Sequence, residues 1–260
     1  MDAYQTVQKA RETNRLSTVE VINTLCSRFI ELHGDRRMKD DEAIIGGIGL
    51  IDDAQPITVI GLQKGRNTAE NIRRNFGSSG PAGYRKAERL MKQAEKFNRP
   101  VLTLINTAGA NATPESERHG IGEAIASILK TMSELTVPTL AIILGEGGSG
   151  GAIALALTDQ VWMLENSIYS ILSPEGFASI LWKDSSLASK AASIMRLTAK
   201  ELKELDIVDR VIPESDGAKV YSNQELAEQL VPEIIKAFAD LQEQSIEKRK
   251  NNRYERFRKF

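Results

Sequence analysis

Residues 144–157 read "LGEGGSGGAIALAL", with an apolar run before them and small residues of helical character after the glycines. Five glycines fall within residues 145–151. A helix that begins there presents N–H groups without intrahelical partners, and its dipole favours negative charge. Glycines also let a ligand approach the backbone without meeting a Cβ atom. The stretch therefore predicts a site for a phosphate, or for an oxyanion that develops during a reaction.

Two other interpretations of the same glycines stay open. Gly145, Gly147 and Gly150 spell G-x-G-x-x-G, and Glu165 lies where a ribose-binding acid belongs in a dinucleotide fold. We rank this interpretation second, because the motif lies in mid-chain and the following helix is short for such a unit. Close packing of a helix on a strand, without any ligand, is the third interpretation, but packing does not explain Glu146 among the glycines.

Composition limits the class of protein. The 260 residues carry a net charge of −1, with 41% hydrophobic and 27% charged residues, as in ordinary globular proteins. Without a basic excess we expect no nucleic-acid partner. The single cysteine, Cys26, excludes an internal disulfide and a cysteine-based zinc site, and we expect no bound metal. No apolar run approaches the ~18 residues of a membrane span, and the amino terminus lacks a signal-peptide core. We expect a cytoplasmic protein that does not bind a membrane.

Strands and helices alternate along the chain. Apolar, extended runs predict strands at residues 43–52 and 56–65, as a hairpin or two neighbouring strands, and four further strands at residues 100–106, 138–144, 160–165 and 206–212. Helices are expected at residues 17–34, 80–98, 121–132 and after Pro174, and a long one from residue 222. The pattern favours one α/β domain over residues 1–260, with an amino-terminal helical segment at 1–36 and a carboxy-terminal helix at 222–260.

The catalytic inventory is small. The chain has two histidines, His33 and His119, and no H-x-x-x-H, G-x-S-x-G or Walker A motif. We expect His33 at the end of the first helix, and Cys26 inert on its inward face. An enzyme built from these residues must work mainly through backbone amides and let its substrate or cofactor supply the base.

Several stretches resemble the alpha subunit of bacterial acetyl-CoA carboxylase carboxyltransferase. The resemblance covers nearly the whole chain, and its most specific motifs are "QKGR" (63–66) with "ENIRRNFG" (70–77), "GEGGSGGA" (145–152) and "SPEGFASILWK" (173–183). It implies a crotonase-type fold of ββα spiral units. It also implies that a carboxyl group moves from carboxybiotin, on a biotin carboxyl carrier protein, to acetyl-CoA. The product is malonyl-CoA, at the first step of fatty acid synthesis.

The resemblance also implies partners and site residues. A homologous beta subunit carries the zinc and most of the acyl-CoA site, in an assembly of two alpha and two beta chains that works with biotin carboxylase. No cofactor is bound covalently to the alpha chain. Gly150 and Gly151 match the family's glycine pair, whose amides stabilise the biotin oxyanion. The surrounding residues expected to bind carboxybiotin or substrate are Gly147, Gly148, Ser149, Gly109 and Ala110.

Other segments leave alternatives open. Residues 106–112 read "NTAGANA", where the family commonly has D-T-P-G-A-Y-P, so the chain is divergent at this loop. The basic group of Lys64, Arg66, Arg73 and Arg74 predicts either salt bridges or contact with a partner or phosphate. Glu175 matches in position an acid that related hydratases use, which keeps a stand-alone acyl-CoA hydratase or isomerase as the alternative function. An assembly subunit without chemistry is the non-enzymatic alternative. In the basic tail we expect Tyr254 and Phe257 to pack on another subunit.

Overall fold

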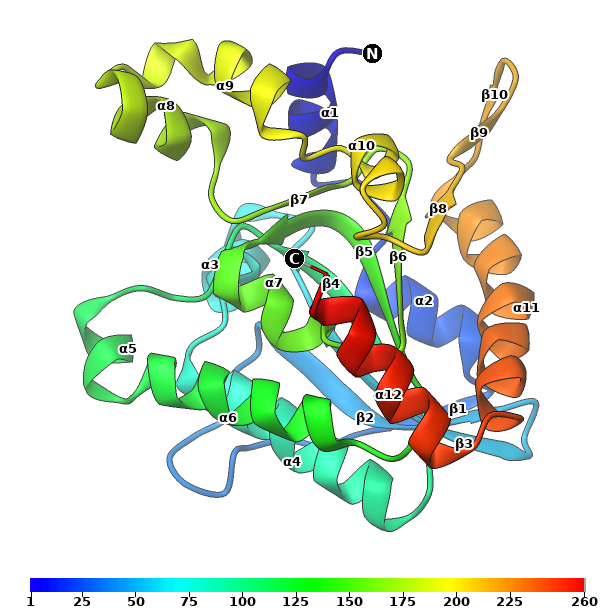
Figure 1. Cartoon of the computed structure of the whole chain (residues 1–260). Helices are drawn as coiled ribbons and strands as arrows, with labels where there is room; N and C mark the ends of the chain where they lie inside the picture. The colour runs from blue at the N-terminus through cyan, green and yellow to red at the C-terminus, as the bar shows by residue number, and fades with distance from the viewer. Residues whose placement is uncertain (260) are drawn as a thin grey trace.

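A central sheet organises the computed structural model, which describes residues 1–259. Its strands follow the order β1-β2-β3-β4-β5-β6-β8, and β7 pairs with β5 (Figure 1). A separate two-stranded ribbon pairs β9 with β10. The strands are β1 (Arg28–Glu31), β2 (Ile44–Ile51), β3 (Gln55–Leu62), β4 (Val101–Thr107), β5 (Thr139–Gly148), β6 (Gln160–Leu164), β7 (Ile168–Ser170), β8 (Arg210–Ile212), β9 (Ser215–Asp216) and β10 (Lys219–Val220).

The sheet is mixed. β1, β2 and β3 pair antiparallel, whereas β3, β4, β5, β6 and β8 run parallel. The predicted hairpin is confirmed, and its turn holds Asp52 and Asp53 at positive φ. Every residue of β4 and of β5 is buried, as expected for parallel strands covered on both faces.

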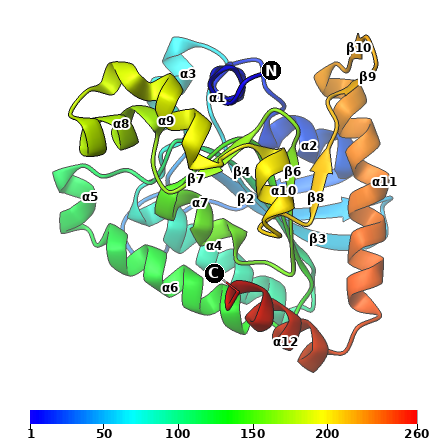
Figure 2. The ribbon, with the colours of Figure 1, turned by 45° about the horizontal axis from the view of Figure 1, so that its top comes forward.

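Helices cover both faces of this sheet, as Figures 1 and 2 show together. α4 and α6 enclose one apolar core that includes Tyr84, Leu90 and Ile128. α2 and α11 enclose a second core that includes Leu25 and Phe238. The helices are α1 (Ala3–Ala10), α2 (Thr18–Leu25), α3 (Thr68–Arg73), α4 (Pro81–Lys96), α5 (Pro114–Arg118), α6 (Ile121–Glu134), α7 (Ser149–Ala156), α8 (Pro174–Trp182), α9 (Ala188–Met195), α10 (Ala199–Glu204), α11 (Asn223–Gln242) and α12 (Ile246–Phe257), with 3₁₀ turns η1 (Asn75–Gly77) and η2 (Ser185–Leu187).

The prediction of one helix over residues 17–34 is wrong. The capping box of Ser17 and Glu20 does start α2, but this helix ends at Leu25, and Cys26 is extended. Phe29 belongs instead to β1, where it pairs with Gly49 of β2. Its apolar spacing from Leu25 fits a helix as well as a strand, and pairing with the sheet edge decides between them. His33 consequently lies in the loop after β1, not at a helix end.

The long carboxy-terminal helix expected from residue 222 is two helices, α11 and α12. Ser245 caps the second one by accepting from the N–H of Lys248. The buried Arg249 side chain then donates to the carbonyl oxygens of Leu241 (2.9 Å) and Gln244. The break therefore satisfies carbonyls at the end of α11, which have no partner within that helix.

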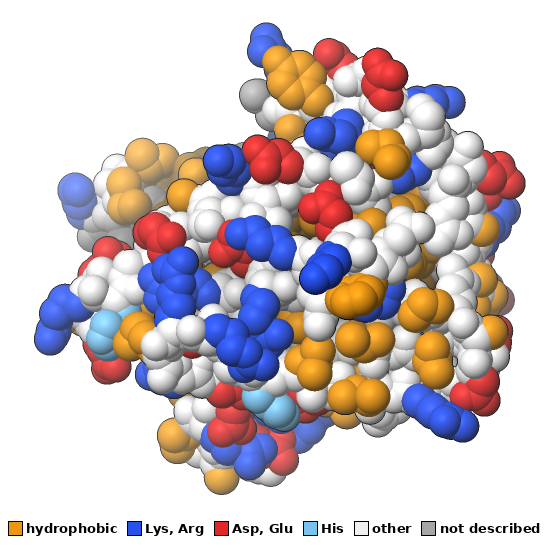
Figure 3. Space-filling model, turned by 90° about the horizontal axis from the view of Figure 1, so that it is seen from below, with side chains coloured by type: hydrophobic (Ala, Val, Ile, Leu, Met, Phe, Trp, Pro, Cys, Tyr) orange, Lys and Arg blue, Asp and Glu red, His pale blue; other side chains and the backbone are white. Residues whose placement is uncertain are grey.

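Charges of both signs are mixed on the face that carries α4 and the loop before β2. Figure 3 shows Lys and Arg side chains gathered there with acidic side chains between them. Ion pairs in this region include Lys86 with Asp40 (2.6 Å) and Arg85 with Glu123 (3.1 Å). Opposite charges that neutralise one another leave this face without the single-sign field that attracts a polyanion.

Two arginines of the predicted basic tail are buried rather than solvated. Arg253 donates to Asp159 (2.8 and 3.0 Å) and to the carbonyl oxygens of Met132 and Leu135 at the end of α6. Its side chain is 2% exposed and that of Asp159 is 4% exposed. Tyr254, by contrast, is exposed, so its packing on another subunit stays a prediction.

We predict that Arg253→Ala lowers the free energy of unfolding by about 3–5 kcal/mol, because it leaves the carboxylate of Asp159 buried without its charge partner. Urea unfolding followed by circular dichroism measures this loss. Lys250→Ala, an exposed position on the same helix, is the control, and we expect a change below about 0.5 kcal/mol. Equal losses in the two variants would contradict the role given to Arg253.

Cys26 is buried, and burial raises the pKa of its thiol to about 11. Because the thiolate is the reactive form, we predict that iodoacetamide at pH 8 modifies the native protein roughly 100-fold more slowly than the urea-unfolded chain. Mass spectrometry of samples taken over time measures both rates. Equal rates would show that the thiol is accessible and ionises normally.

Candidate functional site

The glycine-rich stretch forms the end of β5 and the start of α7. Gly147 pairs with Thr107 of β4 on one side and with Tyr169 of β7 on the other. The prediction that a helix begins at these glycines is confirmed, because α7 starts at Ser149. In Figure 1, α8 lies above the start of α7 and α5 lies below it, and both project to the same side of the molecule.

The first turn of α7 carries amides without a cap. Ser149, Gly150 and Gly151 are its first three residues, and no side chain caps them. Their N–H groups have no acceptor within the helix. Ser149 is exposed and has a left-handed backbone (φ 52°), which is uncommon for a residue with a side chain. This conformation turns the chain sharply from β5 into α7.

Packing explains some glycines of this turn but not Gly150. A Cβ atom on Gly148 would lie 2.0 Å from the carbonyl oxygen of Ala108. On Gly151 it would lie 2.5 Å from the backbone nitrogen of Ala110. On Gly150 its nearest contact would be a flexible methyl group of Ile125, at 3.6 Å. Gly150 is therefore the glycine of this turn at which an added Cβ would make only ordinary van der Waals contact, with the side chain of Ile125.

The facing loop brings Gly109 and Ala110 to the same place. The N–H of Gly109 donates to Oγ1 of Thr107 (3.1 Å), so this amide is already used. The N–H of Ala110 donates no hydrogen bond within residues 1–259. Beneath them, the buried hydroxyl of Tyr84 donates to the carbonyl oxygen of Gly151 (3.3 Å), and burial raises the pKa of Tyr84. The free donors of this site are thus on Ala110 and on the first turn of α7.

Glu146 is held by a closed set of polar contacts. Its Oε1 accepts from Nε of Arg11 (2.9 Å), and its Oε2 accepts from Nζ of Lys64 (2.5 Å). Its backbone N–H donates to Oδ1 of Asn106 (3.1 Å). The residue is 7% exposed, so the two cations offset the cost of burying its charge. With both oxygens occupied, Glu146 fixes the end of β5 and is not a free base.

Glu175, the base of the hydratase alternative, is occupied in the same way. Arg11 donates to both of its oxygens, at 2.8 and 3.0 Å. The hydrogen bond from Arg11 lowers the pKa of Glu175, and the same bond raises the pKa of Arg11. A general base needs an oxygen free to take a proton and a pKa near the working pH. Glu175 has neither property in this structure.

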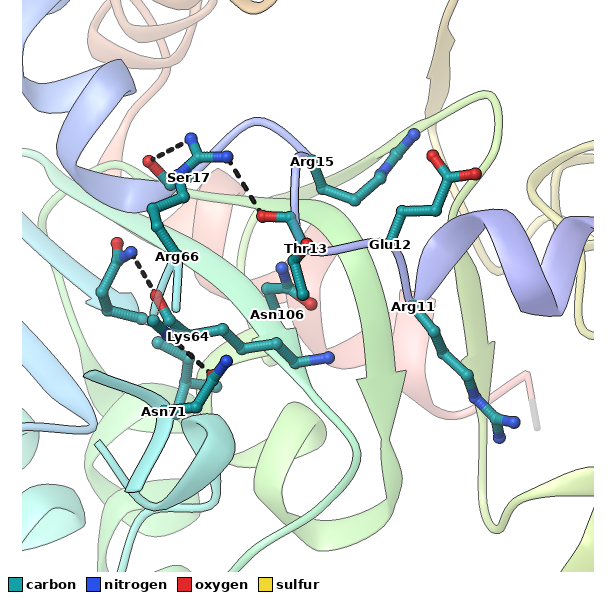
Figure 4. Close-up of a pocket in the computed structure, with 12 residues that line it drawn as sticks. Arg11, Glu12, Thr13, Arg15, Ser17, Lys64, Arg66, Asn71 and Asn106 are labelled. Atoms are coloured by element: carbon teal, nitrogen blue, oxygen red, sulfur yellow. Dashed lines mark hydrogen bonds between the residues drawn. The ribbon is translucent and has the colours of Figure 1, made fainter. Parts of the chain in front are cut away.

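Arg11 and Lys64 line two sides of a small polar pocket, and Figure 4 shows the guanidinium of Arg11 pointing away from Lys64. The same pocket is lined by Arg66, which donates to the carbonyl oxygen of Thr13 (3.1 Å) and pairs with Glu20. Farther along the chain, Arg73 pairs with Glu42 (3.0 Å), and Arg74 donates to the carbonyl oxygen of Glu42 (2.7 Å). The four cations of the predicted basic group therefore make intramolecular contacts, as the salt-bridge interpretation expects.

The other candidates of the sequence lie elsewhere. Nδ1 of His33 is 2.9 Å from Asp40, and His119 ends α5. Glu165 accepts from the N–H of Glu214 (3.1 Å), and α7 has only eight residues, which is short for a dinucleotide-binding unit. Within residues 1–259, no cluster of three or more His, Cys, Asp or Glu side chains is arranged to hold a metal ion. Over the same residues, no helix is long and apolar enough to cross a membrane.

The structure thus brings together all the glycines predicted from the sequence, with Ser149 and Ala110 among them. Sequence reasoning missed Arg11 and the role of Tyr84. The single signal for Arg11 was indirect, since an acidic residue among glycines requires a cation from another segment. Nothing in the local sequence of residues 1–16 identifies which cation this is.

Comparison with known proteins extends the likeness to the whole chain. Residues 1–260 match the family model described as acetyl co-enzyme A carboxylase carboxyltransferase-like. An acetyl-coenzyme A carboxylase carboxyl transferase subunit alpha of Streptococcus equi subsp. zooepidemicus is 52% identical, over 100% of this chain and 99% of its own. The protein of the same description from Streptococcus sanguinis is 54% identical, over 98% and 97%.

Solved structures share the fold at low identity. The transcarboxylase 12S structure has a TM-score of 0.71 and 15% identity, over 88% of this chain and 43% of its own. A Pseudomonas malonate decarboxylase hetero-tetramer in complex with coenzyme A has a TM-score of 0.70 and 15% identity, over 91% and 92%. These neighbours confirm the crotonase-like α/β fold predicted from the sequence. By full-length identity and family match, the chain belongs to the family of acetyl-CoA carboxylase carboxyltransferase alpha subunits.

Proposed function

We propose that this chain is the alpha subunit that transfers a carboxyl group from carboxybiotin, on a carrier protein, to acetyl-CoA. The observation that carries the proposal is the uncapped first turn of α7, where no backbone packs against Gly150 within 4 Å of the Cβ position. N–H donors fixed in place before the reaction stabilise charge that develops in the transition state. Family membership supplies the substrates, and the turn supplies a place for their transient charge.

The chemistry needs no histidine or cysteine base from this chain. When the N–CO₂ bond of carboxybiotin breaks, carbon dioxide leaves and the electron pair spreads onto the ureido oxygen. The same ureido nitrogen takes a proton from the methyl group of acetyl-CoA, and the resulting enolate forms the new C–C bond with carbon dioxide, which gives malonyl-CoA. The amides of Gly150 and Gly151 stabilise the ureido oxyanion in this scheme. Each donor contributes about 3–4 kcal/mol to lowering the barrier.

The neighbouring residues shape the site around these amides. Gly147 and Gly148 place the turn against β4 and β7, and the left-handed Ser149 begins the turn that carries the next two N–H groups. Ala110 supplies a further free amide from the facing loop. Gly109, whose own N–H is used, gives that loop its φ of 152°.

We also propose the family's partners for this chain, in the cytoplasm: a beta subunit, the biotin carboxyl carrier protein and biotin carboxylase. The beta subunit would bring zinc and most of the acyl-CoA site, in an assembly of two alpha and two beta chains. Exposed apolar side chains of Ile171, Ile180 and Leu181, on and before α8, support a subunit contact beside the site. The exposed Tyr254 offers a second contact with a partner subunit. We further propose that residues 1–260 act as one domain.

Alanine substitutions at Gly150 and Gly151 distinguish an effect on catalysis from an effect on packing. We predict that Gly150→Ala changes the free energy of unfolding by less than about 1 kcal/mol, because its Cβ meets nothing closer than 3.6 Å. It should still lower malonyl-CoA formation with the beta subunit and carboxybiotin by roughly 10-fold or more, since the methyl group crowds the amide donors. Initial rates and urea unfolding on the same preparation give both numbers.

Gly151→Ala is the matched variant. Its Cβ would lie 2.5 Å from the nitrogen of Ala110 and 2.8 Å from the hydroxyl of Tyr84, so we expect a loss of about 1–3 kcal/mol in stability. Full activity of Gly150→Ala in a well-folded assembly would contradict the role assigned to this turn.

A further inference from the structure

Arg11 joins two walls of the candidate site. It ends α1, and its guanidinium reaches Glu146 near the end of β5 and Glu175 in the first turn of α8. Glu146 lies two residues before Gly148, which the turn into α7 follows. One side chain therefore connects the strand that carries the amide donors with the helix that projects beside them.

All three nitrogens of this guanidinium donate to a carboxylate, which uses three of its five N–H groups. Nε donates to Glu146, and Nη1 and Nη2 donate to the two oxygens of Glu175. Lys64 completes the coordination of Glu146 from the turn after β3. Each nitrogen of Arg11 is thus held by a carboxylate of the chain itself. The arrangement indicates a role in positioning rather than direct contact with the reacting atoms.

The helix that Arg11 ends, α1, packs against other elements beside the site. Val7 and Ala10 of α1 are fully buried in a small apolar cluster with Ala192 of α9 and Ile168 of β7. Figures 1 and 2 both show α8 and α9 as an arm outside the sheet, with α1 beside α9. α1 thus lies between this arm and the end of β5, and Arg11 is its polar connection to both.

We propose that Arg11 is a positioning residue for carboxyl transfer. Through Glu146 it holds the glycine turn, and through Glu175 it holds α8, so that the amide donors and the α8 wall keep one fixed spacing. The inference rests on the proposed function for its catalytic consequence. Its structural consequence, the coupling of α8 to the glycine turn, stands independently of the substrate.

The kinetic test uses the whole chain assembled with the beta subunit and carboxybiotin. We expect Arg11→Gln to lower kcat by roughly 10- to 100-fold, because small displacements of catalytic groups cost that much, while the KM for acetyl-CoA changes less than about threefold. Arg11→Lys keeps the charge but cannot bind both carboxylates with the same geometry. Its kcat should lie between those of the wild type and Arg11→Gln. Glu12→Gln is the control and should match the wild type, because Glu12 is an exposed neighbour whose side chain makes no hydrogen bond within residues 1–259.

A double-mutant cycle tests the coupling through Glu175. If Arg11 acts partly through this carboxylate, the double variant Arg11→Gln with Glu175→Gln should lose little more kcat than Arg11→Gln alone. Losses that multiply, or an unchanged kcat in Arg11→Gln with only a lower Tm, would overturn the proposal and leave Arg11 a purely structural residue.

Hydrogen exchange of the chain gives a readout that does not need turnover. Arg11→Gln should speed amide exchange in the first turns of α7 and α8 together, whereas Glu12→Gln should not. If the wild-type assembly forms no malonyl-CoA but exchange behaves as expected, the proposed function fails and the positioning role survives. If exchange in both helices is unchanged, the positioning role itself is refuted.

Discussion

The close approach of two backbones, with no side chain between them, is the constraint on which this site depends. Gly148 lies against the carbonyl of Ala108, and Gly151 lies against the amide of Ala110. These contacts bring the ends of two parallel strands within reach of one ligand, as expected at the carboxyl edge of such a sheet. Any side chain at either glycine would push the donors of α7 away from the facing loop.

A closed set of charges then fixes this arrangement. Glu146 would be costly to bury alone, but Arg11 and Lys64 neutralise it from two other segments. Since Arg11 also holds Glu175, the charge that stabilises the end of β5 is the same one that places α8. Glu146 and Glu175 are therefore both held by cations of the chain, and the proposed mechanism leaves the chemistry to backbone amides.

Several basic residues are likewise held by contacts within the chain. Arg249 and Arg253 are buried against carbonyl oxygens and Asp159, so α12 is part of the body of the protein. The cations near residues 64–74 likewise make contacts within the chain. On α8, beside the site, the apolar side chains of Ile180 and Leu181 are exposed.

The sequence by itself determined strands β2 to β6 and β8, and the helix that begins at the glycines. Continuous apolar runs and a glycine cluster act locally, so their consequences follow from short stretches of chain. The same local signals failed at Phe29, where apolar spacing suits a helix or a strand, and at Ser245, where a cap divides one apparent helix into two. The family resemblance located Gly150 and Gly151, but it did not say which glycine packing requires.

Only the tertiary structure decided what Arg11, Lys64 and Tyr84 do. Each of them meets its partner across 60 or more residues of sequence, so no local pattern records the contact. The structure also distinguished Gly150, whose Cβ position meets only a side chain at ordinary contact distance, from Gly151, which makes room for a backbone. The physical reason is the same in both cases, because ion pairs and close contacts depend on distances in space, which the fold sets and the local sequence does not.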